Sequence, residues 1–259
     1  MTSGMHPSEM IVIAARPSMG KTALAMNIAE HVAVDKNIPV AVFSLEMSAQ
    51  QLAQRLLCSR ARVNLQSIRS GIMPKGAEKK LIEAMDVYSN CRMFIDDTAG
   101  LSILELRAKA RRLMDKHGLG LIVIDYLQLL KSPSKRGQEN RQIEIAEISN
   151  GIKALAKELN IPVIVLAQLN RKAEDRGKDG KPRISDLRES GSIEQDADVV
   201  GLLYRSAYYA ANEEEKSEKA GEAELIIAKQ RNGPTGEVPL TFLSEFTRFE
   251  SRDTSHGEN

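Results

Sequence analysis

One stretch of eight residues, Ala-Arg-Pro-Ser-Met-Gly-Lys-Thr at positions 15–22, limits the fold more than any other part of the chain. It follows an apolar run, Met10–Ala15, and precedes a helix that we expect to begin near Thr22. Such a turn between a strand and a helix is typical of a phosphate-binding loop, or P-loop. Its main-chain N–H groups turn inward around a phosphate, and the positive end of the helix dipole faces it. The stretch therefore predicts a site for the phosphates of a nucleotide.

Individual residues of this loop have separate expected roles. Gly20 lets the backbone approach the phosphates, Lys21 reaches the β and γ phosphates, and Thr22 offers a hydroxyl to Mg²⁺. The strict motif has glycine where this chain has Ala15, whose methyl group is a small intrusion that we expect the site to tolerate. A chance match in an ordinary strand–helix turn is the poorer interpretation, because the flanking residues fit the motif. The loop residues predicted to bind the nucleotide are Ala15, Arg16, Pro17, Ser18, Met19, Gly20, Lys21 and Thr22.

Length and composition agree with a single domain. With 259 residues, 42% hydrophobic and 27% charged, the chain can bury a sizeable core, and one α/β domain is the simplest expectation. It has neither an apolar run of the ~20 residues that a membrane helix needs nor a start resembling a signal peptide, so we expect a cytoplasmic protein without a membrane partner. Cys58 and Cys91 have no metal-like spacing, and we expect reduced thiols. The net charge of +1 and the 4% aromatic content mean that nucleic-acid contacts must come from local basic segments.

The first part of the chain alternates short apolar runs with amphipathic stretches, which predicts a parallel sheet covered by helices. Ser102 and Glu105 have the spacing of a capping box and predict the start of one helix. A longer helix is predicted over 145–159, and Asn160 and Pro162 would end it. The predicted buried strands are Met10–Ala15, Val40–Ser44, Met93–Asp96, Leu121–Asp125 and Pro162–Ala167.

The character of the sequence changes after about residue 168. Residues 169–192 are polar and predict a mobile loop, and residues 212–219 predict a solvated insertion. Turn residues within 232–236 predict antiparallel strands appended to the sheet. The strand-like runs are Val199–Tyr204, Leu225–Ala228, Val238–Phe242 and Phe246–Phe249. We expect one domain over residues 1–250 and a disordered tail over 251–259.

Three polar residues end predicted strands, at the edge where ligands gather in open α/β sheets. Asp125 follows Leu-Ile-Val-Ile and has the form of a Walker B acid, which would face the Mg²⁺ shell. Glu46 could polarise the attacking water; alternatively, it only opens the next helix beside the capping pair Ser48 and Gln51. Gln168 could contact the γ-phosphate and signal its loss to the loop that follows.

Two segments are locally basic. Residues 171–188 hold seven Arg or Lys against four Asp or Glu, and residues 131–141 hold four against one. Both segments follow strands whose tips face the predicted nucleotide side, so both could sense the nucleotide. Charge runs of this kind are more often solvated loops, so the two segments alone do not establish nucleic-acid binding.

Six motifs occur in order along the chain: ARPSMGKT (15–22), SLEMS (44–48), LIVIDYLQLL (121–130), VIVLAQLNR (163–171), DLRESGSIEQDAD (186–198) and KQRNGPTGEV (229–238). Together they resemble the motor domain of the bacterial replicative helicases, the DnaB family, from about residue 3 to residue 250. Alanine at the position of Ala15 is also what that family has. The resemblance implies a RecA-like P-loop NTPase fold, in which helices flank a mostly parallel twisted sheet and antiparallel strands are added at its C-terminal end.

The resemblance also implies a function. Members of this family form ring-shaped hexamers that use ATP and Mg²⁺ to move along single-stranded DNA and unwind the duplex at the replication fork. The implied roles in the nucleotide site are the Walker A pair for Lys21 and Thr22, the catalytic base for Glu46, the nucleotide- and Mg²⁺-binding Walker B acid for Asp125, and the sensing residue for Gln168.

Other implied roles lie outside that site. Lys229 and Arg231 match a pair that the family inserts into the neighbouring subunit's site, where an arginine offsets charge on the transferred phosphoryl group. Without the resemblance, Arg231 would be an ordinary basic residue beside a turn. Arg188, Glu189 and Gly191 match positions that grip the DNA backbone, and the two basic segments match loops lining the channel of the ring. Phosphate contacts of this kind bind DNA without reading bases.

The family implies partners as well. Its members usually carry an N-terminal helical domain and a linker helix, so we expect a homo-hexamer that is weakened without them. A helicase loader and a primase are further implied partners, and the replisome at the nucleoid is the implied location. Two other functions fit the sequence less well. A RecA-type recombinase fits the motifs at 186–198 and 229–238 poorly, and the set of Glu46, Asp125 and Gln168 argues against a non-catalytic nucleotide-gated binding module.

Overall fold

A computed structural model describes residues 1–132, 134, 139–170, 181–210 and 212–252, without the side chains of 188–190. The described strands form a nine-stranded sheet in the order β3-β2-β4-β5-β1-β6-β7-β8-β9. The strands from β3 to β6 in this order pair in parallel, and β7, β8 and β9 are antiparallel. Their bounds are β1 (Met10–Ala15), β2 (Val40–Ser44), β3 (Met93–Asp96), β4 (Leu121–Asp125), β5 (Val163–Gln168), β6 (Val199–Tyr204), β7 (Glu222–Gln230), β8 (Gly236–Leu243) and β9 (Arg248–Ser251). The predicted sheet is therefore confirmed.

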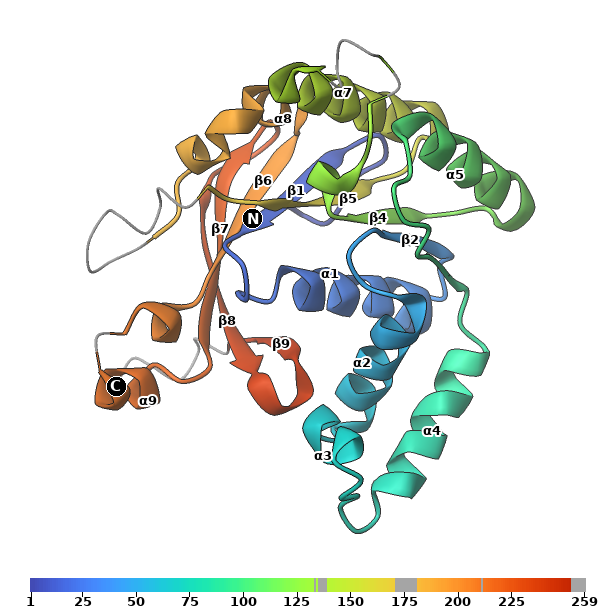
Figure 1. Ribbon diagram of the computed structural model, residues 1–259. Helices are drawn as coiled ribbons and strands as arrows, with labels where there is room; N and C mark the ends of the chain where they lie inside the picture. The colour runs from blue at the N-terminus through green and yellow to red at the C-terminus, as the bar shows by residue number, and fades with distance from the viewer. Residues whose placement is uncertain (133, 135–138, 171–180, 211, 253–259) are drawn as a thin grey trace.

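Helices cover both faces of the parallel part of this sheet (Figure 1). On one side lie α5 (Ile103–His117), α7 (Arg141–Leu159) and α8 (Gly191–Asp196), and on the other lies α1 (Lys21–Glu30). Beyond α1 come α2 (Ala49–Ala61), α3 (Leu65–Arg69) and α4 (Ala77–Ser89). The remaining helical segments are η1 (His31–Asp35), η2 (Leu127–Leu129), η4 (Ile184–Ser190), η5 (Ser206–Tyr209), α9 (Glu213–Glu218) and η6 (Ser244–Phe246). Within the described part of the chain, no helix combines the length and the apolar character that crossing a bilayer requires.

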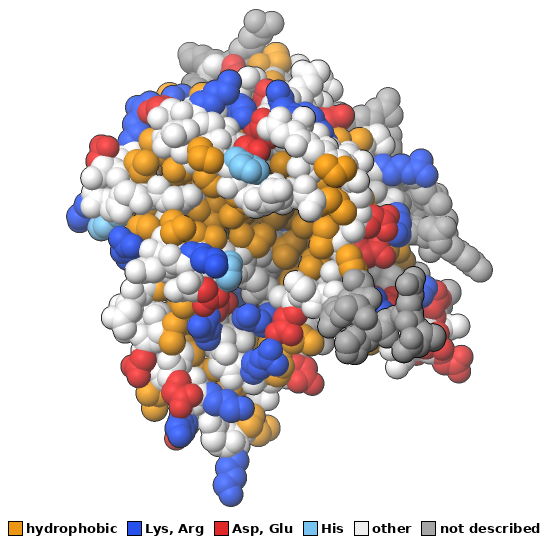
Figure 2. Space-filling model, turned by 180° about the vertical axis from the view of Figure 1, so that it is seen from behind, with side chains coloured by type: hydrophobic (Ala, Val, Ile, Leu, Met, Phe, Trp, Pro, Cys, Tyr) orange, Lys and Arg blue, Asp and Glu red, His pale blue; other side chains and the backbone are white. Residues whose placement is uncertain are grey.

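The central strands are buried on both sides, which explains why their sequences are continuous apolar runs. In β1, Val12 and Ala14 belong to the core formed with α5 and α7, whereas Ile13 and Ala15 belong to the core formed with α1. The surface carries charges of both signs. Seen from behind, Lys, Arg, Asp and Glu are interspersed above and below a band of hydrophobic side chains (Figure 2).

The predicted helix boundaries are confirmed where a cap marked them. Ser102 starts α5 with a capping box, in which its hydroxyl accepts from Glu105 N while the Glu105 carboxylate accepts from Ser102 N at 2.9 Å. The box of Ser48 and Gln51 starts α2 in the same way. Asn160 ends α7 in the left-handed conformation, with φ of 52°.

The prediction of a loop over 169–192 is wrong in its second half, where η4 begins at Ile184 and α8 at Gly191. Asp186 Oδ2 accepts from Arg183 N at 2.7 Å, which fixes the first turn of η4. Leu187 and Ile193 are 2% and 0% exposed. Two buried apolar side chains and a polar cap therefore hold this otherwise polar part against the rest of the domain. Residues 171–180 lie outside the described residues.

Two smaller predictions change at the C-terminal end. The strand expected at Phe246–Phe249 instead runs from Arg248 to Ser251, since Phe246 lies in η6. Ser251, expected in the tail, pairs with Leu240 of β8, and the rest of the tail from 253 lies outside the described residues. The polar insertion at 212–219 contains the short helix α9.

Candidate functional site

The predicted phosphate loop joins β1 to α1 at the carboxyl edge of the parallel sheet. Ser18 and Gly20 have left-handed backbones, with φ of 66° and 92°. A β-carbon at Gly20 would lie 3.1 Å from the ring of Phe249. Glycine is required at this position both by its backbone conformation and by the ring packed against it.

Four side chains expected in the nucleotide site meet at the start of α1. Lys21 Nζ donates to Asp125 Oδ1 at 2.9 Å and lies 3.5 Å from Glu46 Oε2. Thr22 Oγ1 donates to Asp125 Oδ2 at 2.6 Å. Lys21 and Asp125 are buried, whereas the Glu46 side chain is 52% exposed. The structure thus brings Lys21, Thr22, Glu46 and Asp125 into one cluster.

Strand register explains this convergence. Ser44 of β2 is paired with Asp125 of β4, and Ala15 of β1 is paired with Gln168 of β5. Because all four strands are parallel, their carboxyl ends share one edge of the sheet. The buried Asp125 carboxylate at this edge is contacted by the Lys21 amine and the Thr22 hydroxyl, and these contacts offset the cost of burying it. The Thr22 hydroxyl and the Asp125 carboxylate are oxygen donors of the type that Mg²⁺ binds beside phosphates, so the residues present fit that ion.

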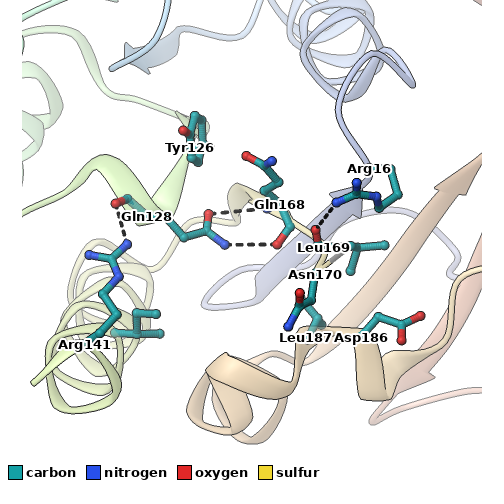
Figure 3. Close-up of a pocket in the computed structure, with 10 residues that line it drawn as sticks. Arg16, Tyr126, Gln128, Arg141, Gln168, Leu169, Asn170, Asp186 and Leu187 are labelled. Carbon is teal, nitrogen blue, oxygen red and sulfur yellow. Dashed lines mark hydrogen bonds between the residues drawn. The ribbon is translucent and has the colours of Figure 1, made fainter. Parts of the chain in front are cut away.

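Gln168 borders a cavity of about 430 Å³ beside the P-loop (Figure 3). Its side chain is exposed and points away from the rest of β5. The polar residues that line the cavity include Arg16, Gln128, Arg141, Gln168, Asn170 and Asp186.

The chain leaving β5 is bonded to the P-loop. Leu169 N donates to Ala15 O at 3.0 Å, and Arg16 Nη1 donates to Leu169 O at 2.8 Å. Asn170 N donates to Asp186 O at 3.2 Å, so the chain returns beside the point where it left. Asn170, which precedes the basic segment 171–188, and Asp186, near its end, therefore lie together beside the P-loop. Arg16 contributes to this link, a role that the motif alone did not predict.

Lys229 and Arg231 are not brought to the P-loop of their own chain. Arg231 N donates to Asp198 O, at the start of β6, whereas the P-loop follows the other end of the adjacent β1. Arg231 Nη2 donates to Gln195 O at 2.5 Å, and Lys229 Nζ donates to Glu194 O at 2.5 Å. Burial, and then the nearby Arg231 charge, lower the pKa of Lys229.

The predicted DNA contacts fall partly outside the described structure. The backbone of Arg188 and Glu189 lies in η4, but their side chains are not among those described. Gly191 is exposed at the start of α8. Of the other basic segment, residues 133 and 135–138 are not described.

A polar residue that touches the P-loop was not predicted from the sequence. Arg205, which directly follows β6, donates from Nη1 to Ser18 O at 3.4 Å, and its guanidinium lies 4.0 Å from the centre of the Phe242 ring. Burial lowers the pKa of Arg205. Its position at the carboxyl end of a strand beside β1 was the one signal that could have identified it.

Comparisons with known sequences give matches over nearly the whole chain. A family described as DnaB-like helicase C-terminal domain matches residues 1–251. Over 249 residues, the chain is 53% identical to the replicative DNA helicase DnaB of Geobacillus stearothermophilus, covering 96% of this chain and 54% of that protein. It is 50% identical, with the same coverage, to the replicative DNA helicase DnaC of Bacillus subtilis. The chain thus spans about half the length of these curated relatives.

Solved structures of related proteins superpose on almost the whole chain. One of them, described as an ATPase domain, superposes with a TM-score of 0.90 at 38% identity, covering 96% of this chain and 87% of that one. A DnaB-like replicative helicase, described together with its interactions with primase, also gives a TM-score of 0.90, at 39% identity, covering 96% of this chain and 59% of that one.

Proposed function

The chain belongs to the DnaB-like helicase C-terminal domain family, and on that premise we propose that it is the ATP-hydrolysing motor of a replicative DNA helicase. The observation that carries this proposal is the cluster of Lys21, Thr22, Glu46 and Asp125 at the carboxyl edge of the sheet. Lys21 and the turn at Gly20 would hold the phosphates of ATP. Glu46, whose Oε2 lies 3.5 Å from Lys21 Nζ, would activate the attacking water.

Each residue of the cluster has a distinct task. Lys21 would exchange Asp125 for the β and γ phosphates, and Thr22 and Asp125 would hold Mg²⁺, which supplies charge neutralisation on the phosphate oxygens. Glu46 is half exposed and would orient and deprotonate the attacking water. Gln168, at the tip of the strand next to β1, would contact the γ-phosphate.

The direct test measures ATP turnover with and without single-stranded DNA, followed by unwinding of a forked duplex. We expect turnover with Mg²⁺, stimulation by a thymidine oligonucleotide, and unwinding whenever rings assemble. Nucleotide binding without turnover in both conditions would contradict the proposal and favour a nucleotide-gated binding module.

We further propose that the working form is a homo-hexamer, because Lys229 and Arg231 lie at the opposite end of the sheet from the P-loop of their own chain. An arginine so placed would serve a neighbouring subunit. The relatives are replicative helicases, and the name of one solved relative mentions primase. We therefore propose single-stranded DNA, a primase and a helicase loader as partners, and the replisome as the place of action.

The DNA contact leads to a quantitative prediction. Arg188→Ala is expected to weaken single-stranded DNA binding equally for all sequences, because the contact would be to phosphate rather than to a base. The slope of log affinity against log salt should fall by about one counterion. Fluorescence anisotropy across a salt series measures both effects. Arg69→Ala, an exposed arginine on α3, is the control. A sequence-dependent loss, or an unchanged slope, would argue against this contact.

A further inference from the structure

The last residue of β5 is held on both sides by segments of the nucleotide site. On one side, Gln168 pairs with Ala15 in the β1–β5 ladder. On the other side, the β4–β5 ladder ends earlier, at Ile124 and Val165. The side-chain amide of Gln128 replaces it there: Nε2 donates to Gln168 O at 3.3 Å, and Oε1 accepts from Gln168 N at 3.4 Å (Figure 3). One side chain thus satisfies both main-chain groups of a residue, as a neighbouring strand would.

Gln128 is itself fixed relative to the acid of the nucleotide site. It lies in η2, three residues after Asp125, and the preceding Leu127 is fully buried. η2 therefore cannot shift without disturbing the core beneath it. A group anchored in this way makes a firm support for the main chain of Gln168.

The basic segment at 131–141 also contacts Gln128. Arg141 ends that segment and begins α7, and its Nη2 donates to Gln128 O at 2.7 Å. The other basic segment, 171–188, begins two residues after Leu169, whose main-chain N and O are bonded to Ala15 and Arg16. Gln128 is thus in contact with one basic segment through Arg141 and with the strand that leads into the other through Gln168.

We propose that Gln128 is a positioning residue that couples the nucleotide site to both basic segments. This rests on the proposed function, since it requires ATP at the P-loop and DNA on those segments. Gln128 contacts the main chain of Gln168, whereas the Gln168 side chain extends away from it (Figure 3). It would therefore act by fixing the direction of that side chain. A displacement of Gln168 when the γ-phosphate leaves would either break this pair of hydrogen bonds or pull η2 and Arg141 along with it.

The test replaces the amide with a side chain of similar length. Gln128→Met removes both bonds to Gln168, and Gln142→Met, an exposed residue in the first turn of α7, is the matched control. We would measure kcat and KM for ATP with and without a thymidine oligonucleotide. Because two hydrogen bonds are removed, the stimulation of kcat by DNA should fall about tenfold. The KM for ATP should stay close to wild type, since the Lys21 cluster is untouched. The melting temperature should also stay close to wild type, since Gln168 is exposed and water can bond to the two main-chain groups that lose Gln128.

A second variant tests whether the effect of Gln128→Met comes from altered packing rather than from the lost hydrogen bonds. Gln128→Glu keeps the shape of the side chain and the acceptor for Gln168 N, but places a carboxylate oxygen against Gln168 O where the donor was, and should also lower the stimulation. Unchanged stimulation in Gln128→Met would overturn this proposal alone, provided that the wild-type chain hydrolyses ATP and responds to DNA. A KM that rises as the melting temperature falls would also overturn it, because the residue would then be purely structural. A wild-type chain without turnover would overturn the proposed function, and this inference with it.

Discussion

Lys21→Ala is expected to abolish ATP turnover while the sheet stays folded. Lys21 Nζ lies at the N-terminus of α1 and is bonded to Asp125 at 2.9 Å, so it is positioned where phosphate charge would be received. Loss of one such preorganised donor costs about 10²–10³ in kcat, and a donor to the transferred phosphate belongs at the upper end of that range. A steady-state phosphate-release assay measures the loss.

The same change affects stability, and this effect must be separated from catalysis. Asp125 is 2% exposed, and removal of its cation leaves a buried carboxylate supported by Thr22. Breaking such a pair costs up to about 3–5 kcal/mol of unfolding free energy. Lys21→Ala with Asp125→Asn removes that charge, and should regain stability without regaining turnover. Lys36→Ala, an exposed lysine beyond the end of α1, should behave as wild type in both respects. Normal turnover in folded Lys21→Ala would refute the assignment of the P-loop.

The parts of the fold that could be predicted from the sequence are those set by residues close together in the chain. The runs of β1, β2 and β4 are buried on both faces, and their apolar residues are contiguous. The caps of α2 and α5 act over three residues. The polar residues at strand tips converge for a simple reason, since parallel strands bring their carboxyl ends to one edge.

The contacts that were not predicted join distant positions. Gln128 bonds to Gln168 across 40 residues, and Arg205 bonds to Ser18 across 187. No local pattern distinguishes such a glutamine or arginine from an exposed one, because its partner is set by how strands and helices pack. The helices η4 and α8 were missed for the opposite reason: their polar composition outweighed two buried apolar residues, Leu187 and Ile193.

The location of Arg231 needed the structure, although its identity as a candidate came from family resemblance. Gln230 pairs with Val199, at the start of β6, and the P-loop lies beyond the far end of the parallel β1. Six residues of strand separate these ends by roughly 17 Å. The Arg231 side chain is 48% exposed; it donates to Gln195 O and forms an ion pair with Asp198. It therefore lies at the surface, at the end of the sheet opposite its own nucleotide site.

Arg231→Ala is therefore expected to lower kcat by about 10³ or more in assembled particles, while ATP affinity changes little. Glu46→Ala should be nearly inactive as well, because it lacks the base. An equal mixture of the two should recover turnover. At an interface where the Arg231→Ala chain supplies Glu46 and the Glu46→Ala chain supplies Arg231, the site is complete. In a head-to-tail ring with random mixing, about one quarter of the interfaces meet that condition.

Recovery in the mixture distinguishes action on a neighbour from action within one chain, since two chains defective in the same self-contained site cannot complement each other. The mass of the particles must be measured on the same samples, with and without nucleotide, so that assembly is known. Arg112→Ala, an exposed arginine on α5, mixed with Glu46→Ala should give only the turnover of the Arg112→Ala sites. If assembled mixtures of Arg231→Ala and Glu46→Ala stay inactive, Arg231 does not complete a neighbour's site, and its bonds to α8 and Asp198 would then be its whole role.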